Sequence, residues 1–205
     1  GAYMYFPTGI LRCRWAVFSA LLLLPVGIGM SAVAEFEKLP ASADKTRRIV
    51  VNSDLGRLTD DARITTLSDA MARAAADPDS NIIEFDPSVF GDKPVSVRLS
   101  APLVVEGTTG GHDYIDGGLL RGGLQIDISG CPDAGIMVSS AGRLTLKNLT
   151  IQGGRQRSVL LRTGGRIFLE DVIIRDSEGP ALALFDLSSA SVIDSRLINN
   201  LTHGV

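Results

Sequence analysis

The residues that could act as acids, bases or ligands lie in the second half of the chain. The acidic candidates are Asp116, Asp127, Glu170 and Asp186, and the basic candidates are Arg143, Arg162, Arg166 and Arg175. Acid–base cleavage of a glycosidic bond needs two carboxyl groups at a defined separation, one of them with a raised pKa. No pair of these residues forms a recognised motif, so the sequence assigns no catalytic residue, no metal ligand and no cofactor.

Two pairs of charged residues recur at one interval along the chain. Arg143 and Arg166 are 23 residues apart, and so are Lys147 and Glu170. Such pairs on neighbouring strands form surface ladders that contribute at most about 1 kcal/mol. We interpret both pairs as solvated ladders and not as catalytic groups.

The histidines and cysteines lack partners at metal-ligand spacing. His112 follows two glycines and His203 precedes one, so we predict a loop residue and a turn residue. Cys13 lies in the N-terminal apolar segment, which leaves Cys131 without an intramolecular disulfide partner. We favour a buried, inert Cys131 thiol, with a reactive thiol or an intermolecular bridge as the alternatives.

The first 34 residues have the layout of a secretory signal peptide. Arg12 and Arg14 precede an uncharged apolar run from Trp15 to Met30, and small residues end at Ala34, where we predict cleavage. A membrane anchor is the alternative, but the run is broken by proline and glycine and falls short of the roughly 20 residues that span a bilayer. Met4 is the preferred start, with the residues before it interpreted as non-native.

The remainder suits one exported domain. Its formal charge of -3 and the absence of a Lys/Arg run argue against a nucleic-acid partner. We divide the chain into a signal peptide (1–34), an N-terminal segment with a helix (35–80) and repeated coils (81–205). Because Val205 falls on the first position of another repeat, we expect this chain to be the N-terminal fragment of a longer protein.

A 23-residue repeat runs through the second half of the chain. Its apolar columns are Leu146, Leu169 and Val192; Ile151, Ile174 and Leu197; and Ile136, Val159 and Leu182. Alternation along the strand places Val138 and Leu161 inside, with Met137 and Leu160 outside. Extending the register back one turn aligns Ile115, Ile126 and Ile128 with Val138, Leu149 and Ile151, which gives about four turns in all.

This period predicts an all-β, right-handed parallel β-helix. Two or three short alternating strands in 23 residues are typical of one coil, whose strands stack on those of the next. Turns are expected at 153–154, 164–165 and 188–189, where glycine or serine pairs occur. A leucine-rich repeat has a similar period, but its fixed Asn and its several leucines per turn are missing.

A polar column divides the repeated strands. Asn148, Asp171 and Asp194 recur 23 residues apart at the expected corner between two strands. Their side chains could cap the backbone amides of the turn and bond along the stack. The alternative is a row of acidic metal ligands, which we consider weaker because nothing else nearby resembles a ligand.

A short amphipathic helix precedes the coils. Thr66 to Asp69 reads as a capping box, followed by apolar residues at helical spacing up to Asp77. We expect this helix to cap the open end of the solenoid, which would otherwise expose its core and unpaired strand edges. Short strands are predicted next, at 82–85, 95–99 and 103–105.

Residues 60–205 resemble a known family. The segment from Thr66 to Met71, Asn81-Ile-Ile-Glu-Phe-Asp-Pro87 and Ile115-Asp-Gly-Gly118 resemble the N-terminal region of bacterial surface β-helix proteins, and the coils are similar to the pectin-lyase-like superfamily. Those proteins carry a Cys-Ser-Leu-Arg-Glu-Ala-Ile motif, and this chain departs from it in lacking the Cys and in having Ser68 where Arg is usual. The resemblance implies a secreted or cell-surface protein.

Two functions follow from this resemblance, and a third possibility is that the fragment only nucleates and caps a larger β-helical rod. The first is a non-catalytic, adhesin-like or carbohydrate-binding surface protein whose partner is a polysaccharide or a host or cell-surface glycan. The second is a polysaccharide lyase or glycoside hydrolase; such relatives hold Ca²⁺ between carboxylates beside a basic residue, or cluster aspartates. The sequence lacks such a cluster, so we favour the first function.

Overall fold

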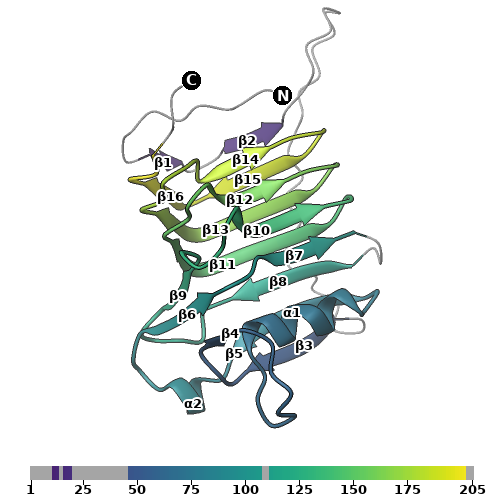
Figure 1. Cartoon of the computed structure of the whole chain (residues 1–205), viewed down its shortest axis with the longest axis vertical. Coiled ribbons are helices and arrows are strands. Elements are labelled where there is room, and N and C mark those ends of the chain that lie inside the picture. The colour runs from purple at the N-terminus through teal and green to yellow at the C-terminus, as the bar shows by residue number, and fades with distance from the viewer. Residues whose placement is uncertain (1–10, 14–15, 20–45, 108–110, 202–205) are drawn as a thin grey trace, which may run out of the picture.

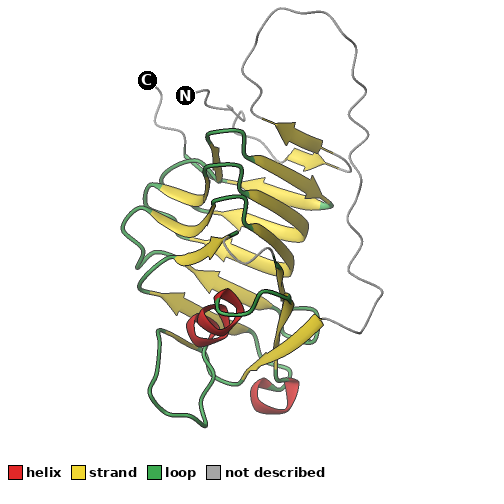
Figure 2. Cartoon of the chain, turned by 90° about the vertical axis from the view of Figure 1, so that its right-hand side faces the viewer, coloured by secondary structure: helices red, strands yellow, loops and turns green. Residues whose placement is uncertain are grey.

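The computed structural model describes residues 11–13, 16–19, 46–107 and 111–201, and it is dominated by parallel strands in two curled sheets (Figure 1). The larger sheet contains β1 (Leu11–Cys13), β2 (Ala16–Ser19), β3 (Thr46–Val51), β4 (Leu55–Gly56), β5 (Ser80–Phe85), β6 (Val95–Leu99), β8 (His112–Asp116), β9 (Leu124–Asp127), β11 (Arg143–Gln152), β13 (Arg166–Arg175), β15 (Ser189–Ile193) and β16 (Ser195–Ile198). The smaller sheet contains β7 (Leu103–Glu106), β10 (Ala134–Ser139), β12 (Arg157–Leu161) and β14 (Leu182–Leu184). The helices α1 (Leu67–Ala75) and α2 (Pro87–Phe90) lie toward one end of the stack (Figure 2).

The chain follows the same course several times, and we call each passage a coil. It crosses the larger sheet twice and then the smaller sheet once, as in β5, β6 and β7 and again in β8, β9 and β10. In the next two coils a single strand, β11 or β13, makes both crossings, since the two halves of β11 pair in parallel with β8 and β9 and those of β13 with β15 and β16. In the first coil, α1 follows β3 and β4 and so takes the place of a strand of the smaller sheet.

The predicted register of the later coils is confirmed. Ile136 pairs with Val159, which in turn pairs with Leu182. Leu146 and Ile151 pair likewise with Leu169 and Ile174. All seven lie in the central hydrophobic core. The apolar columns of the sequence are therefore stacked inward columns of neighbouring strands.

The extension of this register by one earlier turn is wrong. Ile115 pairs with Leu146 and not with Val138, and Ile126 pairs with Ile151 and not with Leu149. The shift at Ile115 arises mainly between β8 and β9, where seven residues, Gly117–Gly123, replace the single corner residue of the later coils. Ile126 lies after that segment, and its interval to Ile151 is 25 residues because the chain takes two more residues from Ile126 to Ile136 than from Ile151 to Val159. A fixed 23-residue step cannot cross an insertion at a corner.

The polar corner column has a backbone role. Asn148, Asp171 and Asp194 have positive φ angles of 54°, 52° and 46°. Asn and Asp enter this left-handed region more readily than other non-glycine residues. One such residue bends the strand at the corner, so that the residue after it points into the core again. Leu149 and Val172, which follow Asn148 and Asp171, are both buried. The column thus allows β11 and β13 to serve both halves of the larger sheet.

Other turns differ in part from expectation. Gly153 and Gly164 have positive φ, in agreement with the predicted glycine turns. The turn expected at 188–189 instead uses Asp186 and Leu187, whose φ angles are 51° and 63°. Ser188 is buried and its hydroxyl accepts a hydrogen bond from the Phe185 amide at 3.0 Å, so it closes the turn from inside.

Strand alternation in the smaller sheet agrees with prediction, with one addition. Val159 and Leu161 lie in the central core, and Leu160 points to the other side. Leu160 is nevertheless only 1% exposed, because it packs with Ala134 and Ala183 in a second apolar cluster that Met137 and Phe185 also contact. An outward position in this sheet is therefore not equivalent to a solvated one.

The predicted helix forms and packs on the end of the core. Leu67, Ala70, Met71 and Ala74 are buried along one face of α1, which contacts β3, β5 and β7. Thr66 caps the helix, since its hydroxyl accepts a hydrogen bond from the Asp69 amide at 3.1 Å. The strands predicted at 82–85, 95–99 and 103–105 correspond to β5, β6 and β7.

We expect loss of this cap to lower stability. The Asp69 carboxylate accepts a hydrogen bond from the Thr66 amide at 3.0 Å, and although burial opposes it, this bonding and the nearby Arg73 charge lower the pKa of Asp69. Its contribution is present above the usual carboxyl pKa and is lost as pH falls through the lowered value. Thr66→Ala and Asp69→Asn should each cost about 1 kcal/mol in urea unfolding at pH 7. Equal losses at pH 2 and pH 7 for Asp69→Asn would contradict this role.

Two strands lie within the range predicted as a signal peptide. β1 and β2 pair antiparallel with β16 and β15 at the end of the larger sheet opposite the helices. Cleavage after Ala34 would remove both strands, and the signal peptide stays a prediction. No helix in the described ranges has the length and hydropathy of a membrane span.

Candidate functional site

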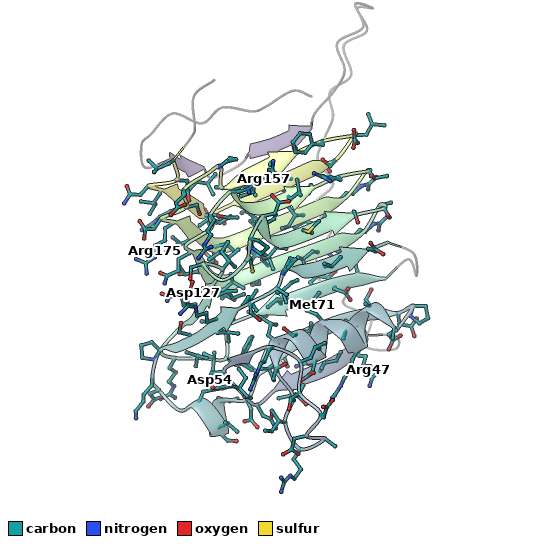
Figure 3. All side chains as sticks on the ribbon, in the orientation of Figure 1. Arg47, Asp54, Met71, Asp127, Arg157 and Arg175 are labelled. Carbon is teal, nitrogen blue, oxygen red and sulfur yellow. The ribbon has the colours of Figure 1, made fainter. Side chains whose placement is uncertain are left out.

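A set of polar side chains crosses the outer surface of the second half of the larger sheet. It consists of Arg98, Gln125, Asp127, Gln152 and Arg175, which we call the polar ladder. Arg98 pairs with Asp127, Asp127 with Gln152, and Gln152 with Arg175 on neighbouring strands. Their positions alternate with the buried core residues, so each points outward. Asp127 and Arg175 lie one above the other on the same side of the stack (Figure 3).

Arg175 links two steps of the polar ladder. Its Nη2 donates to Gln152 Oε1 at 2.9 Å and to Gln125 Oε1 at 3.2 Å. Gln125 in turn donates through Nε2 to the Ser96 hydroxyl at 3.4 Å. These bonds hold two amides and one guanidinium in fixed positions, so little further side-chain entropy would be lost when a ligand binds.

The polar ladder keeps unused hydrogen-bonding capacity. The Arg175 Nε is buried without a hydrogen-bond partner and lies 3.8 Å from Asp176 Oδ2. The Arg175 side chain as a whole is 42% exposed. Arg98 is 71% exposed and lies 3.8 Å from the Asp127 carboxylate, which is a loose, solvent-screened ion pair. Guanidinium and amide groups of this kind bind vicinal hydroxyls and carboxylates.

The acidic candidates do not gather at one place. Asp116 accepts hydrogen bonds from the Gly118 amide and from Asn148 Nδ2, both at 2.8 Å. Glu170 is ion-paired with Lys147 at 2.8 Å, as the ladder interpretation predicted. Asp186 forms the turn after β14. Asp127 accepts from the Ser129 amide and is the one acidic candidate in the polar ladder.

The basic candidates divide between three surfaces. Arg143 and Arg166 pair on neighbouring strands of the first half of the larger sheet, which confirms their shared column. Arg162 directly follows β12 of the smaller sheet, and its guanidinium lies 5.9 Å from the centre of the Phe185 ring. Only Arg175 joins the polar ladder. No three His, Cys, Asp or Glu side chains of the described ranges gather as metal ligands.

The prediction that His112 is a loop residue is wrong. His112 begins β8 and is 6% exposed. Its Nε2 lies 2.9 Å from the Thr145 hydroxyl, its Nδ1 lies 3.1 Å from the Tyr114 hydroxyl, and the two rings stack at 4.2 Å. The preceding glycines indicated a loop, but Gly111 is the last residue before the strand and lies against the Asp79 carbonyl. His203 lies outside the described residues.

Asp113 points inward next to His112, at the end of the core near α1. It is 8% exposed, and Asn81 Nδ2 donates to its Oδ1 at 3.1 Å. Burial raises the pKa of Asp113, the Asn81 hydrogen bond lowers it, and the Asp77 charge adds to the rise. Sequence analysis did not single out this residue, because an acidic residue beside a histidine has no distinctive spacing.

We expect Asp113→Asn to stabilise the protein at neutral pH. A carboxyl whose pKa is raised by folding destabilises the native state once pH exceeds its usual value, and the cost is complete above the raised value. The neutral amide avoids this cost and can still accept from Asn81. Urea unfolding should show a gain of about 1 kcal/mol at pH 7 that disappears near pH 3. A loss of stability at pH 7 would show that the charge is needed.

Cys131 is a free, buried thiol, as predicted. It is 1% exposed, and its Sγ lies 3.9 Å from the Leu99 carbonyl oxygen. Burial, with a smaller effect of Asp127, raises the pKa of Cys131 to about 11. Because the thiolate is the reactive form, this thiol is inert at neutral pH.

Comparison with known proteins gives no further assignment. No family model matches this chain, and neither a curated protein nor a solved structure matches it. The function must therefore be argued from the polar ladder itself. Gln152 and Arg175 carried a signal in the sequence, since they are 23 residues apart. Gln125 did not, because it pairs with Thr150, which is 25 residues later and so falls outside the 23-residue step.

Proposed function

We propose that this protein is a non-catalytic, exported carbohydrate-binding protein that binds a glycan on the polar ladder. We also propose that its curled sheets are a right-handed parallel β-helix of the pectin-lyase-like kind, as found in bacterial surface proteins. The glycan lies along the stack, so that successive coils, about 4.8 Å apart, contact successive parts of the polymer.

The arrangement of Arg175 carries this proposal. One guanidinium orients two amides from two lower coils and still presents a partly exposed surface. Solenoids present extended binding surfaces of this type. Sugar hydroxyls need oriented donors and acceptors in pairs, and Arg175, Gln152, Gln125 and Asp127 supply both on one surface.

The contacts of the outward carboxylates support a binding role without cleavage of the glycan. Asp127 has an arginine beside it, and the other outward candidates cap a turn, pair with Lys147 or form a turn themselves. An acid–base pair needs one carboxyl with a raised pKa. Burial raises the pKa of Asp113, but this carboxyl points inward and away from the polar ladder.

We expect Arg175→Ala to reduce glycan binding about tenfold or more, because it removes the charged donor and releases both glutamines. The full chain is expressed, and the purified protein is run in native gels that contain neutral or uronate polysaccharides. Retardation in these gels measures binding. Arg63→Ala is the matched control, since Arg63 is 90% exposed, lies outside the polar ladder and forms its ion pair within the described ranges with Asp61.

Two outcomes would contradict the proposal. Equal retardation of Arg175→Ala and the unmodified protein would exclude the polar ladder as the binding surface. Release of reducing ends or unsaturated sugars during incubation with the same polysaccharides would show turnover, and would favour the lyase or hydrolase. Binding without release of products is the expected result.

A further inference from the structure

The first coil differs from the others at the smaller sheet, where a helix takes the place of a strand. β7 pairs with β10 on one side, and its other side faces α1. A helix cannot pair with a strand through main-chain hydrogen bonds, because its own amides and carbonyls are used internally. β7 therefore presents an edge of main-chain donors and acceptors that no described strand uses.

A groove runs between this edge and the helix, and we call it the α1–β7 groove. Its volume is about 480 Å³. Its lining includes Met71 and Ala72 of α1 and Leu103 and Val104 of β7, together with Arg57 and Leu58 from the segment that follows β4. The surface is mainly apolar, and Leu58 and Val104 remain 64% and 42% exposed.

Arg57 adds a positive charge to the lining of the groove. Arg57 is exposed and makes no ion pair or hydrogen bond with any residue of the described ranges. An acidic group on a bound ligand would find this cation free, and desolvation at an apolar surface would strengthen the attraction.

We propose that the α1–β7 groove binds an extended peptide segment of a partner protein, which pairs as a strand with the edge of β7. Pairing of an extended peptide with an exposed sheet edge is a general recognition mode, in which the main chain supplies affinity and alternate side chains supply specificity. The peptide has apolar residues at alternate positions, which pack on Met71, Ala72 and Val104, and an acidic residue next to Arg57. This site is separate from the polar ladder and does not depend on the proposed glycan binding.

The test uses a fluorescein-labelled eight-residue peptide of alternating valine and threonine that ends in glutamate, and follows its fluorescence anisotropy with the full chain. We expect saturable binding. Ala72→Trp, which fills the groove from an exposed helix position, should weaken binding about tenfold or more. Ala62→Trp is the matched control, since Ala62 is exposed and lies outside the groove.

Two further arms separate strand pairing from general apolar contact. The same peptide N-methylated at alternate amides keeps its side chains but loses the donors of one edge, so it should not bind. Arg57→Glu should weaken binding of the glutamate peptide and restore it for a peptide that ends in lysine.

No saturable binding, unchanged affinity for Ala72→Trp, or equal binding of the methylated peptide would overturn the proposal. Unfolding midpoints of the variants in urea identify any loss caused by misfolding. Arg175→Ala should bind the peptide normally, so failure of the polar ladder and failure of this groove are distinguishable.

Discussion

Phe85→Ala is expected to lower the free energy of unfolding by about 3–5 kcal/mol. Phe85 ends β5, is fully buried and is among the largest side chains of the central core. Its ring lies 6.2 Å from that of Phe90, the last residue of α2. Truncation would lose the transfer free energy of the ring and leave a cavity that stacked strands cannot close without breaking their pairing. Urea unfolding followed by circular dichroism measures the change.

Phe168→Ala is the matched control for this prediction. Phe168 lies on β13 but points outward and is only partly buried, beside the His112 ring at 5.7 Å. The same atoms are removed without opening the central core, so we expect a loss about half as large or smaller. Losses of equal size would show that the inward columns do not dominate stability.

Gly179→Ala should be at least as disruptive, for a different reason. A Cβ at Gly179 would lie 1.7 Å from the carbonyl oxygen of Gln156 in the coil below. That oxygen belongs to the backbone, which is held in place on both sides by hydrogen bonds such as that from the Glu178 amide to the Gly154 carbonyl at 2.7 Å. The stack must therefore separate locally, and we expect a loss of about 3 kcal/mol or more, or failure to fold.

Gly123→Ala isolates the effect of backbone conformation from that of contact. Gly123 has a φ of 83°, but a Cβ there would meet no atom within 4 Å. Only the strain of a left-handed alanine applies, which costs about 1 kcal/mol. If Gly179→Ala proved no more destabilising than Gly123→Ala in urea unfolding, close stacking at Gly179 would be excluded as the cause.

The repeat could be predicted from the sequence because stacking gives equivalent residues the same environment. Ile136, Val159 and Leu182 are all apolar since all face one core, and a constant interval between them reveals the coil. The 23-residue step does not hold at Ile115 and Ile126, because the segments between β8 and β9 and between β9 and β10 are longer than their counterparts in the later coils. Insertions at corners do not disturb the core, so nothing in the apolar pattern marks them.

The candidate site was harder to foresee. The candidates chosen from the sequence were charged residues and did not include Gln125 or Gln152, yet these are the side chains that Arg175 orients. The surroundings of His112 were missed for a related reason. Its partners Tyr114 and Thr145 come from the same strand and from the strand of the next coil, and only pairing between coils brings Thr145 to it.

The sequence by itself determined the alternation of buried and exposed positions, the interval of the later coils and the capped helix, because each depends on residues that are near in sequence or repeated at a fixed step. The tertiary structure decided which outward residues meet and that Leu160 is buried although it points outward. It also decided that α1 takes the place of a strand, so that no described strand pairs with the second edge of β7. These features depend on contacts between coils across corners of unequal length, and a short-range pattern carries no information about them.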